Sequence, residues 1–358
     1  MKKIILLVVL LLPLKVYSIS ASSVVAMDLN NGRVLYGYNL DEKKLIASTT
    51  KIMTAIIAIE NSDIEKLVEV SDVIYKAYGS AIYIEKGEKI SIKDLLYGLM
   101  LRSGNDAALV IAEAVSGSKE EFVYLMNEYA NNLNMNNTHF YNPHGLEENN
   151  GNANKSTARD MAKLTKYAME NETFKTIFKT KNYTTKTNYK TYSWHNKNKL
   201  LSLDYITGGK TGYTELARRT LVTTGSKDGI DVVVVTLNDP NDWSDHKTIY
   251  QEIFKKYRSY EIIKKEDFEI KEDTYYKDDY LYIKNNYNMT LTEKELKKLK
   301  LNFNLLKLKN YVDDTLVGYV EVKLNNNIYH KEPIYVELKK EDKNLSWWQK
   351  FQRWLNKW

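Results

Sequence analysis

The sequence predicts an α+β protein in which one antiparallel sheet is flanked by helices. A small all-β domain and a C-terminal amphipathic helix are expected to follow. Strand-like segments stand at both ends of residues 21–260, with helical patterns between them. Short alternating segments rich in Tyr, Val and Ile fill residues 261–341. Four tryptophans occur within residues 342–358, which form the last expected unit.

The N-terminal stretch "MKKIILLVVLLLPLKVYSISAS" predicts a secretory signal peptide over residues 1–20. Two lysines precede an apolar run at residues 4–14, which is too short for a spanning helix, and small residues follow. Cleavage after Ser18 and cleavage after Ser20 both fit, and a retained N-terminal anchor is the alternative. Cleavage would remove three lysines and lower the formal charge from +6 to +3. So small a positive excess does not indicate a nucleic-acid partner.

The next elements follow from periodicity and turn residues. Alternating apolar segments on either side of Asn30-Asn31-Gly32 predict a hairpin. Apolar residues on every side of 52–59 predict a buried helix. The pattern predicts further helices over residues 91–118 (broken at Ser103-Gly104), 119–135, 157–171 and 245–260, and strands over 208–214, 219–229 and 230–239. We expect the first and last strands to share one sheet.

The tail "NLSWWQKFQRWLNKW" predicts an amphipathic helix. Trp347, Phe351, Trp354 and Trp358 would share one face, Trp348 would border it, and the cations would lie off it. Tryptophans suit the bilayer interface and cations suit anionic head groups. The segment is therefore expected to anchor the protein to an anionic membrane surface, although docking on the protein itself is the alternative.

The stretch "IASTTKIMTA" places Ser48 one helical turn before Lys51. The spacing Ser-x-x-Lys occurs three times in the chain, and at Ser116 and Ser244 a helix cap explains it. Ser48 differs because it precedes the most apolar helix, where Lys51 would be desolvated beside the hydroxyl. A lysine acts as a base only when burial or another cation disfavours its ammonium form. Lys210 in "GGKTG" could supply that cation.

Two further motifs accompany this pair. "RSGND" places Ser103 and Asn105 at a helix break, and "GGKTGYT" places Lys210, Thr211 and Gly212 on a predicted strand. Ser-x-Asn and Lys-Thr-Gly each occur once. Ser-x-x-Lys, Ser-x-Asn and Lys-Thr-Gly, in that order, are the motif set of penicillin-binding proteins and class A β-lactamases.

The chain resembles the low-molecular-mass penicillin-binding proteins that act as D-alanyl-D-alanine carboxypeptidases. The stretches "ASTTKIMTA", "DLLYGLMLRSGNDAA", "FYNPHGL", "STARDMAKLT", "WHNKNKLL" and "GGKTGYT" carry this resemblance over residues 22–260. It implies a serine β-lactamase/DD-peptidase-like fold. The β-rich segment and the tryptophan-rich tail resemble the family's C-terminal domain and membrane-surface helix in character only.

The resemblance also implies roles for the motif residues. Ser48 would attack the carbonyl of the penultimate D-alanine, and Lys51 would take its proton. Ser103 would relay a proton to the leaving D-alanine, and Asn105 would hold the substrate amide. Lys210 and Thr211 would bind the terminal carboxylate, and Gly212 would admit the substrate backbone. The N–H groups of Ser48 and Tyr213 would form the oxyanion hole.

Several expectations and alternatives follow from this reading. Arg218 and Arg219 stand where the family commonly has a glycine before its next strand, and His144 is expected to serve a turn rather than act as a base. A β-lactamase is the second enzyme class considered, although Glu147 and Glu148 lack a family-like setting for its extra glutamate. A non-catalytic wall-binding protein of the same fold is the third.

The expected partners are peptidoglycan stem peptides, β-lactams as inhibitors and an anionic membrane, with the protein exported to the extracytoplasmic membrane face. No metal or organic cofactor is indicated, and the absence of cysteine excludes disulfides and a thiolate nucleophile.

Overall fold

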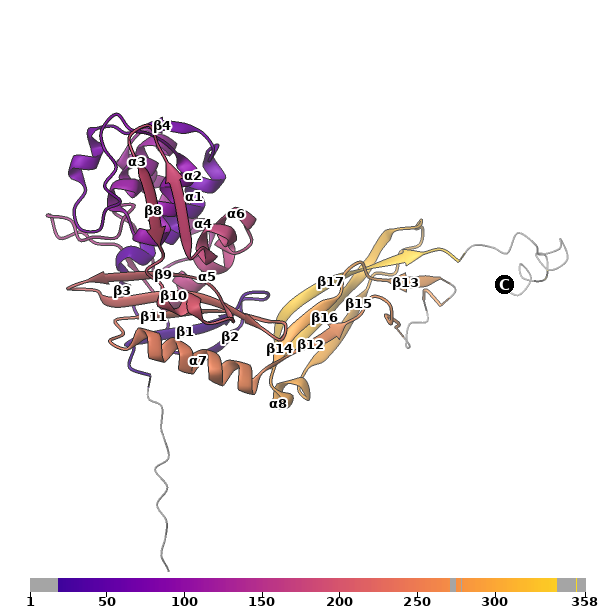
Figure 1. Cartoon of the computed structure of the whole chain (residues 1–358). Helices are drawn as coiled ribbons and strands as arrows, with labels where there is room; N and C mark the ends of the chain where they lie inside the picture. The colour runs from indigo at the N-terminus through magenta and orange to yellow at the C-terminus, as the bar shows by residue number, and fades with distance from the viewer. Residues whose placement is uncertain (1–18, 271–274, 278, 340–351, 353–358) are drawn as a thin grey trace, which may run out of the picture. The chain divides into compact units, whose positions relative to one another are not determined.

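The computed structural model describes residues 19–270, 275–277, 279–339 and 352, and contacts divide the chain into two compact units (Figure 1). The units are Met1–Lys256 and Tyr257–Trp358. The boundary expected after residue 260 therefore falls inside the strand β12 (Arg258–Ile263). Residues 1–18 of the expected signal peptide and the five aromatic residues of the expected membrane anchor lie outside the described residues.

A five-stranded antiparallel sheet forms the base of the first unit. Its strands are β1 (Ser23–Asp28), β2 (Val34–Tyr38), β9 (Ile206–Thr214), β10 (Arg218–Lys227) and β11 (Ile230–Leu237). They lie in the order β2-β1-β11-β10-β9. The pairing of β1 with β11 confirms that strands from the two ends of this unit share one sheet. The expected α+β class, with helices flanking an antiparallel sheet, is also confirmed.

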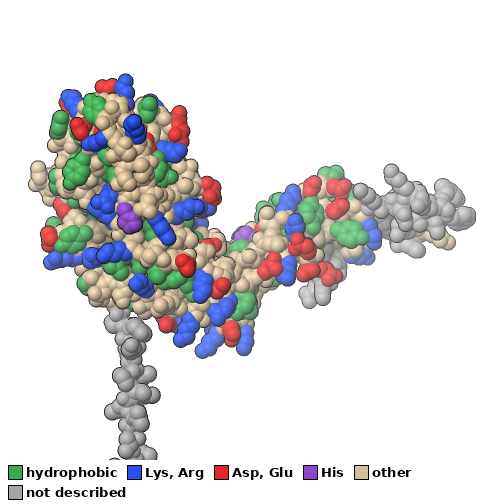
Figure 2. Space-filling view, in the orientation of Figure 1, with side chains coloured by type: hydrophobic (Ala, Val, Ile, Leu, Met, Phe, Trp, Pro, Cys, Tyr) green, Lys and Arg blue, Asp and Glu red, His purple; other side chains and the backbone are tan. Residues whose placement is uncertain are grey.

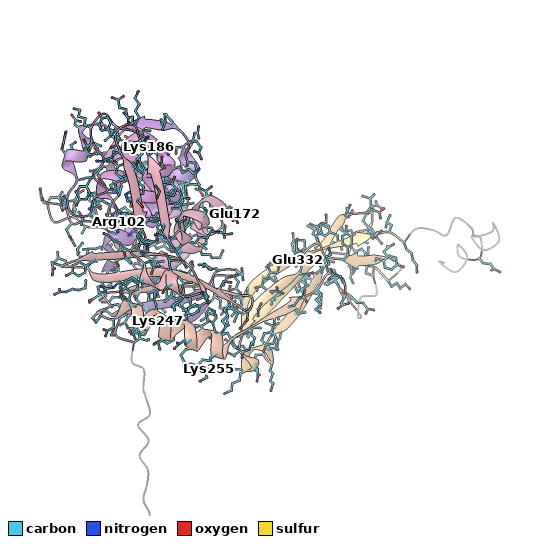
Figure 3. All side chains as sticks on the ribbon, in the orientation of Figure 1. Arg102, Glu172, Lys186, Lys247, Lys255 and Glu332 are labelled. Atoms are coloured by element: carbon cyan, nitrogen blue, oxygen red, sulfur yellow. The ribbon has the colours of Figure 1, made fainter. Side chains whose placement is uncertain are left out.

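Helices cover both faces of this sheet (Figure 1). The helix α7 (Asp242–Lys256) lies against β10 and β11, while α5 (Ala158–Ala168) contacts β1 and β11 and α6 (Glu172–Lys179) contacts β9. Because both faces are covered, the run Val232–Val235 is wholly buried although it is antiparallel. Charged side chains such as Glu172 on α6 and Lys247 on α7 are exposed (Figure 3).

Besides α1 (Lys51–Asn61), whose first eight residues are buried, this unit has further helical elements. They are the 3-10 turns η1 (Ala47–Thr50), η2 (Asp72–Lys76) and η4 (Lys199–Ser202), and the helices α2 (Ile92–Tyr97), α3 (Asn105–Ser116) and α4 (Lys119–Asn132). A single π-helical turn, Gly98–Arg102, continues α2 and ends at Ser103, which adopts φ +65°. This left-handed residue breaks the helix at the position that the sequence predicted.

Several elements escaped the sequence pattern. The short strand pairs are β3 (Lys44–Leu45) with β6 (Lys155–Ser156), β4 (Leu67–Glu69) with β5 (Lys89–Ser91), and β7 (Asn182–Lys186) with β8 (Thr191–His195). The helix α6 was missed as well. The predicted helix over 245–260 was too long, because the chain turns into β12 after Lys256.

The second unit is built of strands. β12 pairs with β14 (Tyr287–Leu291), and a four-stranded sheet has the order β13-β17-β16-β15. Those four strands are Tyr280–Tyr282, Asn327–Glu337, Thr315–Leu324 and Lys300–Leu305. The one short helix among the described residues of this unit is α8 (Glu293–Leu296), which a capping box at Thr292 begins. The alternating segment at 268–273 forms no strand over its described residues 268–270.

No described helix combines the length and the apolar character needed to cross a membrane. On the visible face, lysine and arginine side chains predominate across the middle of the first unit, whereas both signs of charge are mixed over the second unit (Figure 2).

Candidate active site

The first site residue, Ser48, lies in the 3-10 turn that leads into α1. Its neighbour Ala47 is buried and adopts φ +45°, which is strained for a residue with a Cβ. Gly145 packs directly on this turn, since a Cβ at Gly145 would lie only 1.9 Å from the carbonyl oxygen of Ala47. The glycine in "NPHGL" thus permits the close contact that helps to hold Ser48 at the start of the helix.

Lys51 is completely buried beside that hydroxyl. Its Nζ lies 3.1 Å from Ser48 Oγ, 2.7 Å from Asn105 Oδ1 and 2.6 Å from the carbonyl oxygen of His144. Burial, followed by the charges of Lys210 and Lys197, lowers the pKa of Lys51 well below its usual range. A neutral amine has two N–H donors, which the two carbonyl oxygens accept. Its lone pair is then left to accept the hydrogen of the Ser48 hydroxyl.

Ser103 and Asn105 follow the π-helical turn and face the same group. Asn105 donates from Nδ2 to the carbonyl oxygen of Tyr78 at 2.6 Å, while its Oδ1 accepts from Lys51. One amide hydrogen of Asn105 therefore remains for a substrate carbonyl. Ser103 Oγ lies 3.1 Å from Nζ of Lys210, so this hydroxyl joins the strand β9 to the helical side of the site.

The strand β9 brings the Lys-Thr-Gly motif against the start of α1. Lys210 is buried, and desolvation with the charge of Lys197 lowers the pKa of Lys210 to about 7. A Cβ at Gly212 would lie 2.9 Å from the backbone nitrogen of Ser48, so only glycine fits this approach. Thr211 is half-buried on the same strand, and the phenol of Tyr213 is exposed and donates to Glu215 Oε1 at 2.7 Å.

The structure thus joins Ser48, Lys51 and Asn105 by hydrogen bonds, and Ser103 and Lys210 by another. The charge of Lys210 acts on Lys51, so the two sets form one group electrostatically. Gly212 touches this group through the backbone. The side chain of Tyr213 takes no part in it, and the role expected for its N–H stays a prediction.

Two contributors were missed by sequence reasoning. Lys197 lies at the rim, where its Nζ donates to Ser80 Oγ at 3.1 Å, and its charge lowers the pKa of both buried lysines. The stretch "WHNKNKLL" contains this residue, but nothing in the spacing marked it as a cation of the site. The second missed contributor is the carbonyl oxygen of His144. A sequence motif cannot identify such an acceptor, because every residue has a backbone carbonyl.

Replacing Lys197 by glutamine should move the acidic limb of the acylation rate to higher pH. Removal of this cation raises the pKa of Lys51 and of Lys210, so a higher pH is needed to keep the base uncharged. We expect a shift on the order of one pH unit, measured as acylation rate against pH. Lys199→Gln, at an exposed lysine two residues away, is the matched control and should leave the profile in place.

The imidazole of His144 is buried in the turn and accepts from the N–H of Leu146 at 3.1 Å. Burial, together with the charges of Lys51 and Lys119, lowers the pKa of His144 to about 3. The ring is therefore neutral at physiological pH. Glu147 accepts from the Thr214 hydroxyl at 2.5 Å, and Glu148 pairs with Lys119 at 2.5 Å. No hydrogen bond joins these two glutamates to Ser48 or Lys51.

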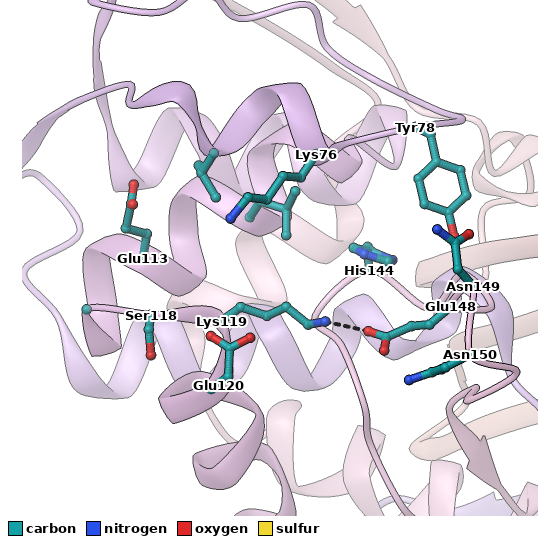
Figure 4. A pocket seen from close by; sticks show the side chains of 13 residues that line it. Lys76, Tyr78, Glu113, Ser118, Lys119, Glu120, His144, Glu148, Asn149 and Asn150 are labelled. Carbon is teal, nitrogen blue, oxygen red and sulfur yellow. Dashed lines mark hydrogen bonds and ion pairs between the residues drawn. The ribbon is translucent and has the colours of Figure 1, made fainter.

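A cavity of about 520 Å³ lies on the other side of His144. Figure 4 shows the Lys119–Glu148 pair on its wall, with Tyr78 and His144 nearby. None of the eight residues predicted to act in catalysis or substrate binding lines this cavity. The cavity nevertheless adjoins the group around Ser48, because the carbonyl oxygens of two lining residues, His144 and Tyr78, accept hydrogen bonds from Lys51 and Asn105.

Arg218 begins β10, directly after the turn that follows β9. It adopts φ +58°, a left-handed conformation that is costly for an arginine. Arg218→Gly should raise the free energy of unfolding by about 0.5–1 kcal/mol, since relief of strain exceeds the added entropy of the unfolded chain. Urea unfolding measures this change. Arg219→Gly should instead destabilise, because Arg219 pairs with Asp242 at 2.7 Å.

Comparison with known families places these observations in context. The family model described as D-alanyl-D-alanine carboxypeptidase, Peptidase_S11, matches residues 13–241. A D-alanyl-D-alanine carboxypeptidase of Streptomyces sp. strain K15 is 38% identical over 252 residues, which cover 64% of this chain and 85% of that protein. D-alanyl-D-alanine carboxypeptidase DacF of Bacillus subtilis is 35% identical over 222 residues, and the match spans 60% of this chain but only 56% of the relative.

Solved structures agree with this grouping. Penicillin binding protein 5 from Haemophilus influenzae superposes with a TM-score of 0.73 at 25% identity, covering 90% of this chain and 98% of that one. A mutant of the Streptomyces K15 DD-transpeptidase superposes with a TM-score of 0.61 at 34% identity, covering 65% of this chain and 97% of that one. The first match extends over the β-rich unit, whereas the second is confined to about two thirds of the chain.

Proposed function

Because the chain belongs to the D-alanyl-D-alanine carboxypeptidase family, we propose that it removes the terminal D-alanine from peptidoglycan stem peptides through a serine acyl-enzyme. The family membership confirms the resemblance seen in the motifs. The observation that carries the proposed mechanism is the position of the buried Lys51 Nζ 3.1 Å from Ser48 Oγ, where burial lowers the pKa of the amine.

In the proposed acylation, Lys51 accepts the hydroxyl proton of Ser48 while Oγ bonds to the penultimate D-alanine carbonyl carbon. The backbone N–H of Ser48 stabilises the negative charge that develops on the carbonyl oxygen, and the N–H of Tyr213 is proposed as the second donor. The proton then passes to the leaving nitrogen through Ser103, and the C–N bond breaks. Water later hydrolyses the ester and restores Ser48.

The bound substrate would change the charge state of Lys210. The pKa of Lys210 is lowered to about 7, so the free enzyme holds this amine only partly protonated at neutral pH. A terminal carboxylate bound beside Lys210 and Thr211 favours the ammonium form of Lys210. The resulting charge pair would hold the C-terminus of the substrate in the site.

The two alternatives have less support. A β-lactamase needs fast deacylation, yet Glu147 and Glu148 are committed to Thr214 and Lys119 rather than to the nucleophile. A non-catalytic wall-binding protein would not need a buried lysine at a depressed pKa beside a strained serine turn.

We also propose that the protein is exported, because residues 1–20 resemble a signal peptide. Its C-terminal segment would then attach to the extracytoplasmic face of the cell membrane. Deleting residues 344–358 is expected to release the purified protein from anionic vesicles. Peptidase activity on a soluble peptide should stay unchanged. Vesicle co-sedimentation measures the first, and continued sedimentation of the shortened protein would contradict the proposed anchor.

The proposed activity is tested by release of D-alanine from an acylated pentapeptide that ends in D-Ala-D-Ala. We expect release by the wild-type protein and none by Ser48→Ala with an unchanged circular dichroism spectrum. A slowly hydrolysed penicillin adduct is expected in parallel. Rapid penicillin turnover without D-alanine release would favour the β-lactamase, and neither reaction would favour the wall-binding protein.

A further inference from the structure

Tyr83 is held in a conformation that tyrosine rarely adopts. Its φ is +62°, in the left-handed region where a residue with a Cβ is strained, and 76% of the residue is exposed. Such strain persists only where the surroundings enforce it, and it is often associated with function. If this exposed position served only to turn the chain through a left-handed φ, glycine or asparagine would be favoured there.

The backbone of Tyr83 is fixed on both sides. Its N–H donates to Asp106 Oδ2 at 2.8 Å, and the same carboxylate accepts from the N–H of Ile82. Its carbonyl oxygen accepts from Lys190 Nζ at 2.7 Å and lies 3.4 Å from the hydroxyl of Tyr192. By contrast, the phenol has no hydrogen bond or ring contact with the described part of the chain. The structure therefore fixes the main chain and presents the side chain to solvent.

The loop that carries Tyr83 is tied to the active site. Asp106, which anchors it, directly follows Asn105, and the N–H of Asn105 donates to the carbonyl oxygen of Ser80 at 2.8 Å. The loop that carries Tyr83 is thus hydrogen-bonded to Asn105, the residue proposed to hold the substrate amide, and to its neighbour Asp106.

The surroundings of Tyr83 suit an uncharged ligand. Lys190 pairs with Glu85 at 2.7 Å, and Lys86 pairs with Asp72 at 3.4 Å. A second aromatic ring, Tyr189, is 50% exposed and contacts the same loop through the carbonyl oxygen of Lys86. The charges next to Tyr83 are therefore paired within the protein, whereas Lys197 on Ser80 has no ion pair among the described residues, and aromatic faces are left open. The negative face of such a ring attracts the C–H groups of a polyhydroxylated sugar ring.

We propose that Tyr83 is a glycan contact, which stacks against a sugar ring of the peptidoglycan strand while its stem peptide occupies the site around Ser48. This rests on the proposed peptidase function and adds a subsite for the polysaccharide part of the substrate. The contact would lower KM for glycan-linked substrate without changing the chemical step.

The test compares two substrates, a free pentapeptide and the same pentapeptide carried on an N-acetylglucosamine–N-acetylmuramic acid disaccharide. Tyr83→Ala should raise KM for the disaccharide substrate about 3–10-fold, the value of one aromatic contact, and leave kcat unchanged. Both constants for the free pentapeptide should match wild type. Tyr83→Phe should behave as wild type on both substrates, because the stacking ring is retained. Tyr124→Ala, at a tyrosine on α4 that is 65% exposed, is the matched control and should change nothing.

Equal losses on the two substrates would overturn the proposal, because they would indicate a peptide contact or a disturbed site. Unchanged constants on both would overturn it as well. The thermal midpoint of Tyr83→Ala should equal or exceed that of wild type, since the substitution adds no clash to a strained position. If the wild-type protein released no D-alanine from the free pentapeptide, the peptidase function would be refuted. This result differs from those that would refute only the glycan contact of Tyr83.

Discussion

Replacement of Lys51 by methionine is expected to slow acylation by a β-lactam about 10³-fold or more, because loss of a general base typically costs about 10²–10⁴-fold in rate. The amine is the one group within hydrogen-bond distance of Ser48 Oγ in the described structure that can accept its proton. Methionine fills a similar volume in this fully buried position but provides no basic lone pair. Stopped-flow acylation with a chromogenic cephalosporin measures the loss.

Lys51→Gln provides the matched control for folding. Its amide can still donate to the oxygens of Asn105 and His144, which accept from Lys51 at 2.7 and 2.6 Å. We expect this variant to unfold near the wild-type temperature and to be as inactive as the methionine variant. If Lys51→Gln kept more than a tenth of the wild-type acylation rate, Lys51 would be a structural residue and not the base.

The second large effect is expected from Gly212→Ala, with a loss of acylation of about 10²-fold or more. The added Cβ would lie 2.4 Å from Thr220 Oγ1 and 2.9 Å from the backbone nitrogen of Ser48. β9 must therefore move away from the nucleophile, which disturbs the N–H that stabilises the oxyanion. Acylation rate and thermal unfolding are measured together.

The double variant Gly212→Ala/Thr220→Ala separates two causes of this loss. It removes the contact with Thr220 Oγ1 but leaves the one with Ser48 N. The double variant should stay inactive if the approach of β9 to Ser48 matters. Recovery of acylation in the double variant would show that the hydroxyl clash alone was responsible.

Much of the site was predictable because its chemistry depends on side chains at short, fixed spacing. Ser48 and Lys51 are one helical turn apart, and Ser103 and Asn105 flank a helix break that Gly104 signals. Lys210 could be added only through the order of three motifs, since the fold brings it to Ser103 from more than a hundred residues away.

The remaining contributors could not be read from the chain because they act through the backbone or through long-range electrostatics. His144 contributes a carbonyl oxygen, which every residue has. Lys197 acts through its charge on two buried amines, which depends on distances that only the fold sets. The strain at Ala47 is likewise invisible in the sequence, because alanine gives no signal for a positive φ.

The fold shows the same division between local and tertiary information. The buried strands of the main sheet were predicted from apolar runs such as that of β11. The hairpin β7–β8 was missed although Tyr192 and Trp194 alternate with polar residues in β8, because β7 has one aromatic residue among asparagine, threonine and lysine. It is held by packing, with Trp194 and Tyr192 buried against the helical region.

Mass spectrometry of the penicillin-treated protein after proteolysis tests the central claim most directly. We expect one covalent penicilloyl group on the peptide that contains Ser48, and no such group in Ser48→Ala. An adduct on another residue of the wild-type protein, or full labelling of Ser48→Ala, would contradict the assignment of Ser48 as the nucleophile.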